Sequence, residues 1–275
     1  MKNIESVKYL RNWEFKGFEI RIVEKSYHLF PKHIHDGIYT LSLVESGGSF
    51  CLGKNNPHSY IKKDHMALIN PGQVHSCVPP KDRFVSYMTF SIDEQYMRKI
   101  AADLFGKYNY LPEFPNPVMD NRMISRLFKN LAYFFIINED HFALEVNLAS
   151  SLGHLLSEYG YHKKKDSSVK KNNPAVRKSI EFLMDHLEDN ISLDELARAS
   201  GTSKFHFLRL FKEATGLPPH QFRTQKRIEF SKRLIKKGTP LSQVALLSGF
   251  SDQSHFTNRF RLLTGSSPKQ YADNR

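Results

Sequence analysis

The sequence predicts a multidomain protein of mixed α and β structure, with an N-terminal β-barrel followed by helices and a C-terminal domain that is all α. Three observations predict this fold class. Short stretches rich in β-branched and aromatic residues fill residues 18–92, apolar residues at helical spacing fill residues 121–160, and the C-terminal third repeats one pair of short amphipathic helices. A chain of 275 residues is long enough for two medium-sized domains.

The barrel is predicted by five short apolar stretches. They read FEIRIVE, YTLSLVES, GSFCLG, HMALINPG and FVSYMTFSI, and residues that favour turns separate them. This pattern is typical of a small all-β barrel, which can enclose one small ligand. Cys51 and Cys77 are too few for a disulfide framework, so we interpret both as small core residues in a reducing compartment.

Two helices are expected after the barrel, because apolar residues recur there at steps of three and four. The residues of this series are Ile124, Leu127, Phe128, Leu131, Phe134, Phe135, Leu144, Leu148, Leu152, Leu155, Leu156 and Tyr159. They supply more apolar surface than a small barrel needs.

Positive charge is concentrated toward the C-terminus. Lys and Arg number 18 against 17 Asp and Glu in residues 1–161, 5 against 1 in residues 162–173, and 17 against 10 in residues 174–275. The middle segment, HKKKDSSVKKNN, is polar and lacks apolar periodicity, so we predict a linker between domains 1–161 and 174–275. The basic balance favours a polyanionic partner such as DNA. No stretch resembles a secretion signal or a membrane span, so a cytoplasmic protein is expected.

The repeat is recognised by residues in register. The pairs are Ala197 with Ala245, Gly201 with Gly249 and Ser203 with Ser251 and, after one inserted residue, Phe207 with Phe256, Phe211 with Phe260, Gly216 with Gly265, Pro219 with Pro268 and Phe222 with Tyr271. In the first copy Ser192 and Glu195 have capping-box spacing, and Gly201 can end the first helix. Ser203 and Ser251 are the expected caps of the second helices. Each copy is therefore predicted to be a helix-turn-helix.

A helix-turn-helix places the outward face of its second helix in the major groove of DNA. We expect the DNA-binding residues to be Ser203, Lys204, Phe205, His206, Leu208, Arg209 and Lys212 in the first copy, and Gln253, Ser254, His255, Asn258, Arg259 and Arg261 in the second. Asn and Gln can pair with adenine and Arg with guanine. A purely structural helical bundle is the alternative.

One helix is expected between the copies, over HQFRTQKRIEFSKRLIKKG. About 18 helical residues span ~27 Å, which would let one chain reach two successive major grooves about one DNA turn, or ~34 Å, apart. Arg223, Arg227 and Lys232 on or near this helix are expected to contact phosphates.

Residues 174–275 resemble the DNA-binding domain of the AraC/XylS family of bacterial transcription regulators. The resemblance is carried by IKKGTPLSQVALLSGFSDQSHFTNRFRLLTGSSPKQY in the second copy. It implies that the base-contacting positions are Phe205, His206, Leu208, Arg209, Gln253, Ser254, His255 and Asn258. Leu208 stands where a polar residue is common, so the first copy is expected to read fewer bases by hydrogen bonding.

The stretches HLFPKHIHDGIYTLSLVESGGSF and INPGQVHSC resemble the cupin-like regulatory domain of sugar-responsive members of the same family. This implies an effector-binding pocket, for which His33, His35, Tyr39, His75 and Tyr87 are the candidate residues, with Trp13 as a further aromatic side chain. The resemblance also implies that the helices at 121–160 pair two subunits. Packing on the barrel of their own chain is the alternative.

His33, His35 and His75 can converge as nitrogen ligands of a metal ion. Metal-binding cupins usually add a glutamate four or five residues after the second histidine, where this chain has Tyr39 and Thr40. We therefore predict no metal, no other cofactor and no catalytic residue, and expect histidines that hydrogen-bond or line a ligand pocket.

The predicted function is sequence-specific, DNA-binding transcription regulation, with activation as the expected mode and a small-molecule effector, with a sugar as one candidate. The expected partners are double-stranded DNA, the effector, RNA polymerase and a second copy of the chain, and no membrane. Three alternatives stay open: a ligand-independent regulator, a metal-dependent cupin enzyme fused to a DNA-binding domain, and a non-specific architectural DNA protein.

Overall fold

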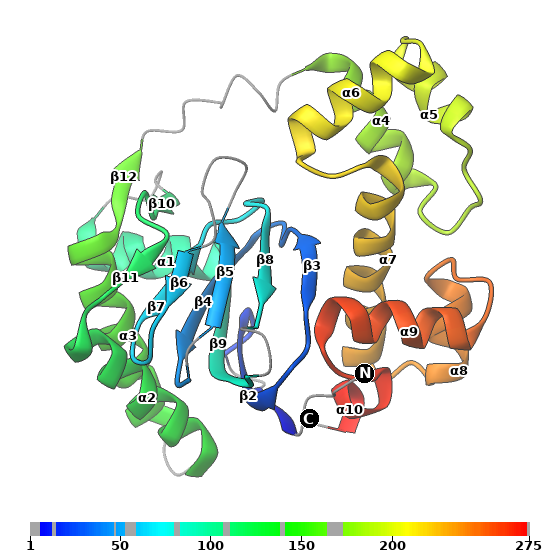
Figure 1. Cartoon of the computed structure of the whole chain (residues 1–275). Coiled ribbons are helices and arrows are strands. Elements are labelled where there is room, and N and C mark those ends of the chain that lie inside the picture. The colour runs from blue at the N-terminus through cyan, green and yellow to red at the C-terminus, as the bar shows by residue number, and fades with distance from the viewer. Residues whose placement is uncertain are drawn as a thin grey trace. The chain divides into compact units, whose positions relative to one another are not determined.

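The computed structural model describes residues 6–12, 15–46, 48–52, 59–79, 83–106, 111–137, 141–163 and 173–273 (Figure 1). The chain divides into two compact units between residues 166 and 167, with residues 30–33 counted in the second. That division falls inside the linker predicted for 162–173, most of which lies outside the described residues. Residues 162 and 163 belong to a strand, β12 (Tyr161–Lys163), which pairs with β10 (Leu111–Glu113).

The first unit contains a six-stranded antiparallel sheet. Its strands, in spatial order, are β1 (Ser6–Leu10), β2 (Phe18–Ser26), β9 (Val85–Asp93), β4 (Ile38–Val44), β7 (Met66–Ile69) and β11 (Val118–Met119). The pairing of β4 with β9 sets Leu41 opposite Phe90 and Tyr39 opposite Ile92. Because side chains alternate along a strand, these four residues share one face of the sheet.

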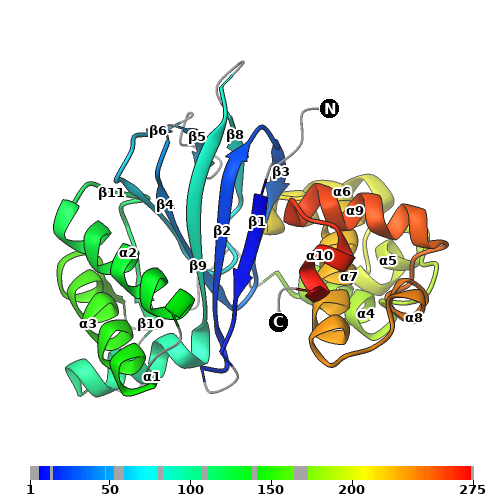
Figure 2. The same cartoon turned by 90° about the horizontal axis from the view of Figure 1, so that it is seen from below.

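A four-stranded sheet completes the β structure, in the order β3 (Phe30–His33), β8 (His75–Val78), β5 (Gly48–Leu52) and β6 (Ser59–Ile61). Because β3 is hydrogen-bonded to β8 in this sheet, we describe β3 with the β structure of the first unit. The five predicted stretches correspond to β2, β4, β5, β7 and β9, and the predicted fold class is confirmed. One difference is that the described strands form three separate sheets, of six, four and two strands, instead of a closed cylinder (Figure 2).

One face of the larger sheet is covered by the helices α1 (Glu94–Phe105), α2 (Arg122–Ile137) and α3 (His141–Tyr159) (Figure 2). Asp93 caps α1 by accepting a hydrogen bond from the Gln95 N–H at 2.7 Å. The main core lies between helices and sheet, where Phe90 packs edge-on against Phe128 with ring centroids 4.9 Å apart. Every residue of the predicted apolar series of α2 and α3 except Leu127 belongs to this core or packs against it, so the alternative of packing on the sheet of the same chain accounts for these residues.

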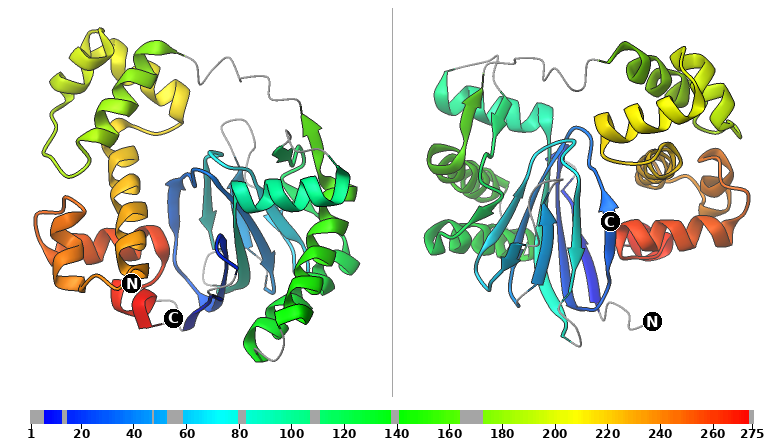
Figure 3. Two further views of the ribbon diagram at one scale, coloured as in Figure 1. Left: turned by 180° about the vertical axis from the view of Figure 1, so that it is seen from behind. Right: turned by 45° about the horizontal axis from the view of Figure 1, so that its top comes forward.

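The second unit is all helical, as predicted. It contains α4 (Pro174–Asp185), α5 (Leu193–Ser200), α6 (Lys204–Thr215), α7 (Pro219–Lys236), α8 (Leu241–Leu247), α9 (Gln253–Thr264) and α10 (Pro268–Asp273). The pairs α5–α6 and α8–α9 are the two helix-turn-helix motifs, and α7 runs between them (Figure 3). Helix α7 has the predicted length of 18 residues.

The two copies repeat each other in detail. Gly216 and Gly265 both end the second helix with φ of 77°. The hydroxyl of the preceding threonine donates to the carbonyl of the buried phenylalanine four residues earlier, at 2.8 Å from Thr215 to Phe211 and 2.8 Å from Thr264 to Phe260. The duplication inferred from sequence is therefore also a duplication of hydrogen bonds.

Candidate nucleic-acid interface and histidine cluster

The reading face predicted on α6 is open to solvent. Leu208 is half-buried, and the other predicted residues of this copy are exposed: Ser203, Lys204, Phe205, His206, Arg209 and Lys212. Phe205 is 87% exposed. Phe207 and Phe211, on the opposite side of the helix, are fully buried, so packing fixes which side of α6 faces outward. A capping box of Ser192 and Glu195 starts α5, as predicted.

The reading face predicted on α9 is also exposed, over Gln253, Ser254, His255, Asn258, Arg259 and Arg261. The cap of this helix differs from the prediction, because Asp252 and not Ser251 is the capping residue. Its carboxylate accepts the His255 N–H at 2.7 Å, and the Ser251 hydroxyl donates to the same carboxylate at 3.0 Å. These hydrogen bonds, led by that from His255, lower the pKa of Asp252. Ser203 occupies the equivalent place before α6 but makes no capping hydrogen bond.

The assignment of Arg227 to DNA phosphates is wrong. Its guanidinium is buried within the second unit and donates to three backbone carbonyls, those of Leu187 at 2.8 Å, Glu188 at 3.3 Å and Asp189 at 2.9 Å. Burial lowers the pKa of Arg227 to about 10. The side chain thus joins α7 to the loop that follows α4, and it is not available to the outer surface.

The other two basic residues in that prediction also have partners within the second unit. Arg223 donates to the carbonyl of Ile191 at 3.1 Å, and the Lys232 ammonium lies 5.8 Å from the ring centroid of Tyr271. Their assignment to phosphates stays a prediction.

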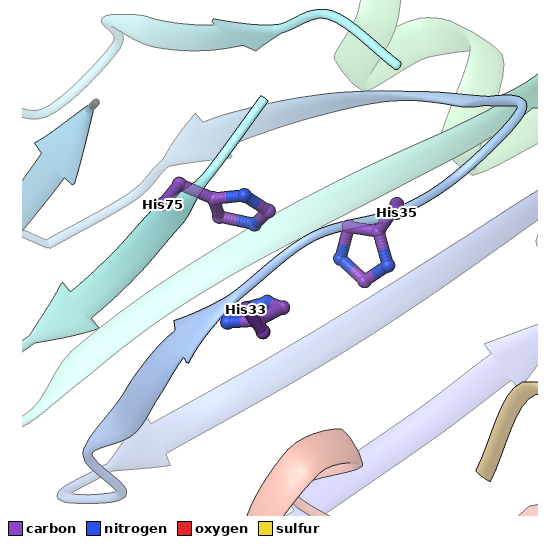
Figure 4. Close-up of side chains that lie close together, drawn as sticks. All are labelled: His33, His35 and His75. Atoms are coloured by element: carbon purple, nitrogen blue, oxygen red, sulfur yellow. The ribbon is translucent and has the colours of Figure 1, made fainter. Parts of the chain in front are cut away.

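Three of the candidate effector residues come together where β3 lies beside β8. One ring nitrogen from each of His33, His35 and His75 lies within 4.8 Å of the other two (Figure 4). His33 ends β3, His35 follows two residues later, and His75 begins β8, the neighbouring strand. Nδ1 of His33 lies 2.7 Å from the carbonyl of Pro31, and Nδ1 of His75 lies 3.1 Å from that of Gln73. Burial lowers the pKa of His75 to about 4, and the Arg21 charge acts in the same direction.

The two candidate tyrosines do not share one site. Tyr39 lies in the core between the larger sheet and the helices, and its hydroxyl donates to the Pro112 carbonyl at 2.6 Å. Tyr87 is opposite Val44 in the register and alternates with Phe90 and Ile92, so it points to the other face. The register therefore puts the two tyrosines on opposite faces of the sheet, and a role for either one in binding an effector stays a prediction. Trp13 and the side chain of Cys51 lie outside the described residues, and Cys77 is buried as predicted.

Sequence reasoning missed Arg21 in this unit. Its guanidinium lies 5.5 Å from the ring centroid of Tyr87, and one of its nitrogens lies 3.5 Å from the tyrosine hydroxyl. The only sequence signal was one arginine within the apolar strand FEIRIVE, where a charged side chain needs a polar environment.

Known proteins match both units. Residues 15–132 match the family described as AraC-like ligand binding domain, and residues 196–274 match a helix-turn-helix domain family. Over 250 residues the chain is 30% identical to the uncharacterized HTH-type transcriptional regulator YbfI of Bacillus subtilis (strain 168), covering 90% of this chain and 86% of YbfI. The chain belongs to the AraC family of transcriptional regulators.

The chain is also similar to a second relative and to a solved structure. The HTH-type transcriptional activator AarP of Providencia stuartii is 30% identical over 97 residues, which are 35% of this chain and 72% of AarP. The crystal structure of an apo ToxT variant from Vibrio cholerae superimposes with a TM-score of 0.60 over 94% of this chain and 97% of ToxT. At 15% identity, this likeness shows a shared fold alone.

Membership of the AraC family gives the two units their general roles. The first unit is the ligand-binding domain and the second binds DNA through its helix-turn-helix motifs, a role that is not enzymatic in these transcriptional regulators. In the part of the chain that the structure describes, no helix combines the length and apolarity needed to span a bilayer.

Proposed function

We propose that this chain is a sequence-specific regulator in which α6 and α9 read bases in two successive major grooves of one DNA duplex. The observation that carries the proposal is the matched exposure of the two second helices. In each copy the phenylalanines that anchor the helix are buried, and the polar and basic side chains on the other side are exposed. A structural bundle has no need for two such faces at equivalent positions.

The exposed side chains divide by chemistry into base readers and phosphate binders. Asn258 and Gln253 carry amides suited to the adenine edge, and Arg209 carries a guanidinium suited to guanine. Phe205 is suited to the methyl group of thymine. Lys212 and Arg261 lie in the last turns of their helices, where a cation suits phosphate contacts that position the domain without reading sequence.

Selection of bound DNA from a random pool by the full-length protein tests the proposal. We expect two short half-sites about one helical turn apart. If no DNA sequence is enriched, or if the affinity for DNA depends on salt concentration but not on sequence, sequence-specific binding is contradicted. Either result would favour the alternative of a non-specific architectural DNA protein.

Asn258→Ala is expected to weaken binding to the selected site by about 5- to 150-fold and to relax the preference at one base pair, because one bidentate contact is lost. Lys212→Ala is expected to weaken binding to all sequences alike and to reduce the salt slope by about 1. Gel-shift titrations over a salt series measure both effects. Lys178→Ala removes an exposed cation from α4 and is the matched control, with affinity near that of the unchanged protein.

The first unit is proposed to hold a small-molecule effector, with a sugar as the candidate class. A ligand that prefers one arrangement of the regulator would change operator affinity by an ordinary allosteric coupling of about 1–3 kcal/mol. A thermal-shift screen of sugars identifies binders, and operator titration with and without each binder measures the coupling. Equal affinity and equal transcription in both states would favour the ligand-independent alternative.

A second copy of the chain is proposed to pair through α2 and α3. Large apolar side chains remain exposed on the described parts of these helices: Met123, Tyr133, Ile136, Phe142 and Val146. Exposed apolar patches are typical of interfaces between protein chains.

Tyr133→Asp combined with Phe142→Asp is expected to convert a dimer into a monomer, as measured by light scattering after gel filtration, because two buried charges would lack partners. The matched control is Leu29→Asp, at an apolar residue that is 53% exposed between β2 and β3. Dimers that survive the double substitution would place the interface elsewhere.

Activation of transcription through contact with RNA polymerase, in the cytoplasm, is the proposed outcome, supported by the similarity of 97 residues of this chain to the activator AarP. In vitro transcription from a promoter that carries the selected site tests it. Fewer transcripts on adding the protein would show repression.

A further inference from the structure

We propose that His33, His35 and His75 form a binding site for a divalent transition-metal ion of the zinc type, with at least one coordination position open to an exogenous ligand. This inference deepens the proposed effector site, because it gives the ligand-binding unit a metal ion as ligand or as part of its ligand. It reverses the expectation of no metal, which rested on the missing glutamate.

The geometry of the cluster suits such an ion. Imidazole nitrogen is a preferred ligand of Zn²⁺, Ni²⁺, Co²⁺ and Cu²⁺, and three histidines form a complete protein ligand set for a zinc ion that keeps an open position. Tetrahedral Zn–N bonds of about 2.0–2.1 Å place ligand nitrogens roughly 3.4 Å apart. The nitrogens now lie within 4.8 Å of one another, a separation that small rotations of the rings can close.

The hydrogen bonds of the rings select the nitrogen that binds. A carbonyl oxygen can only accept, so Nδ1 of His33 and Nδ1 of His75 carry the protons that point to Pro31 and Gln73. In the neutral ring, Nε2 then holds the lone pair that a metal ion needs. A backbone carbonyl behind a histidine ligand is the usual device that fixes its tautomer and orientation in metal sites.

The backbone holds the two parts of the cluster together. The Gly72 N–H donates to the carbonyl of His35 at 2.8 Å, which ties the segment after β3 to the turn before His75. Gly72 has φ of 70°, a conformation that favours glycine, and the Gln73 N–H closes the turn on the Asn70 carbonyl at 3.1 Å. The site is thus assembled before an ion arrives, which reduces the cost of ordering its ligands.

Burial and charge define what the site accepts. His33 and His75 are 6% and 4% exposed, whereas His35 is half-buried and offers the route by which an ion can enter. Three nitrogen donors without a carboxylate disfavour Mg²⁺ and Ca²⁺, which prefer oxygen.

Titration of metal-free, untagged full-length protein with Zn²⁺ against a chromophoric chelator tests the site, with Co²⁺ as a spectroscopic substitute. We expect one equivalent to bind with submicromolar affinity, a Co²⁺ absorption typical of four-coordinate nitrogen ligation, and no response to Mg²⁺ or Ca²⁺. His35→Gln removes the most accessible ligand and is expected to weaken Zn²⁺ binding by at least about 100-fold, since even outer partners of metal ligands contribute 10- to 100-fold.

His154→Gln is the matched control, because His154 is exposed on α3 away from the cluster, and it is expected to bind Zn²⁺ as the unchanged protein does. If His35→Gln does not fold, X-ray absorption of the zinc-loaded unchanged protein decides by counting imidazole ligands. Absence of stoichiometric binding, equal affinity in His35→Gln, or fewer than three imidazoles overturns the site.

The same samples separate this inference from the proposed function. Selection of bound DNA from a random pool, carried out with the metal-free and with the zinc-loaded protein, measures sequence-specific DNA binding. This measurement is independent of the affinity for zinc. A protein that selects a DNA site but binds no zinc overturns only the metal site, and one that binds zinc but selects no DNA overturns only the regulator proposal.

Discussion

Gly249→Ala is expected to destabilise the second unit by about 3 kcal/mol, whereas the same change at the equivalent Gly201 costs only about 1 kcal/mol. Both glycines end the turn region of their motif in the left-handed conformation, with φ of 75° and 69°. An alanine in that conformation is strained by roughly 1–2 kcal/mol at either position. The two positions therefore differ only in what surrounds them.

The added methyl group at Gly249 has no room. A Cβ there would lie 2.7 Å from Nη2 of Arg227 and 2.8 Å from Cα of Glu188, while nothing lies within 4 Å of a Cβ at Gly201. The guanidinium cannot move without weakening its hydrogen bonds to the carbonyls of Leu187 and Asp189. Overpacking of this kind costs about 1–3 kcal/mol beyond the backbone strain.

Urea denaturation followed by hydrogen exchange of residues 173–273 measures both variants. Faster exchange in α8 and in the loop after α4 is expected for Gly249→Ala, because Arg227 links these two places. Equal losses in the two variants would mean that backbone strain alone matters and that the hydrogen bonds of Arg227 contribute little.

The helical unit could be predicted closely from sequence because its signals are local. The capping spacing of Ser192 and Glu195, the left-handed Gly201 and the apolar steps through Phe207 and Phe211 each act within one or two turns. Because the motif is duplicated, most of these local signals occur twice in the sequence. The cap of α9 was misplaced because Ser251 and Asp252 are adjacent residues of types that both cap well, and it is the Asp252 carboxylate that accepts the His255 N–H.

The environment of Arg227 could not be predicted in this way. In the sequence it stands among other basic residues of α7, which is the pattern of a solvated, DNA-facing helix. Its burial depends on carbonyls about forty residues earlier, in a loop whose position is set by tertiary packing. No local pattern distinguishes it from Arg233, which is exposed.

The first unit was predictable as strands but not as a site. Tyr39 and Tyr87 were grouped by residue type, yet the register of β4 against β9 sends them to opposite faces, and one residue of slip would reverse this. The histidines could be named together because a spacing of two keeps His33 and His35 on one side of an extended chain. Their convergence with His75 depends on β3 lying beside β8. The pairing of these two strands could not be predicted from sequence, because each has only four residues.

Phe260→Ala is expected to destabilise the second unit by about 3–5 kcal/mol, the usual cost of removing a buried phenylalanine. Phe260 is 0% exposed and lies in a row of rings, with centroids 5.6 Å from Phe256 and 5.5 Å from Tyr271. Its loss leaves a cavity that loosens α9 against α10 and α7. Denaturation followed by hydrogen exchange should show that α7, α9 and α10 lose protection at lower denaturant concentrations than α5 and α6.

Phe205→Ala is the control that separates folding from reading. The same side chain is removed, but Phe205 is 87% exposed, so stability should change by less than about 0.5 kcal/mol. DNA affinity should nevertheless fall, because the proposed role of the ring is contact with the methyl group of a thymine in the groove. If Phe205→Ala lowered stability as much as Phe260→Ala, or left DNA binding unchanged, the outward face of α6 would not be the reading surface. Comparing the stability and the DNA affinity of Phe260→Ala and Phe205→Ala therefore tests which side of α6 faces the DNA.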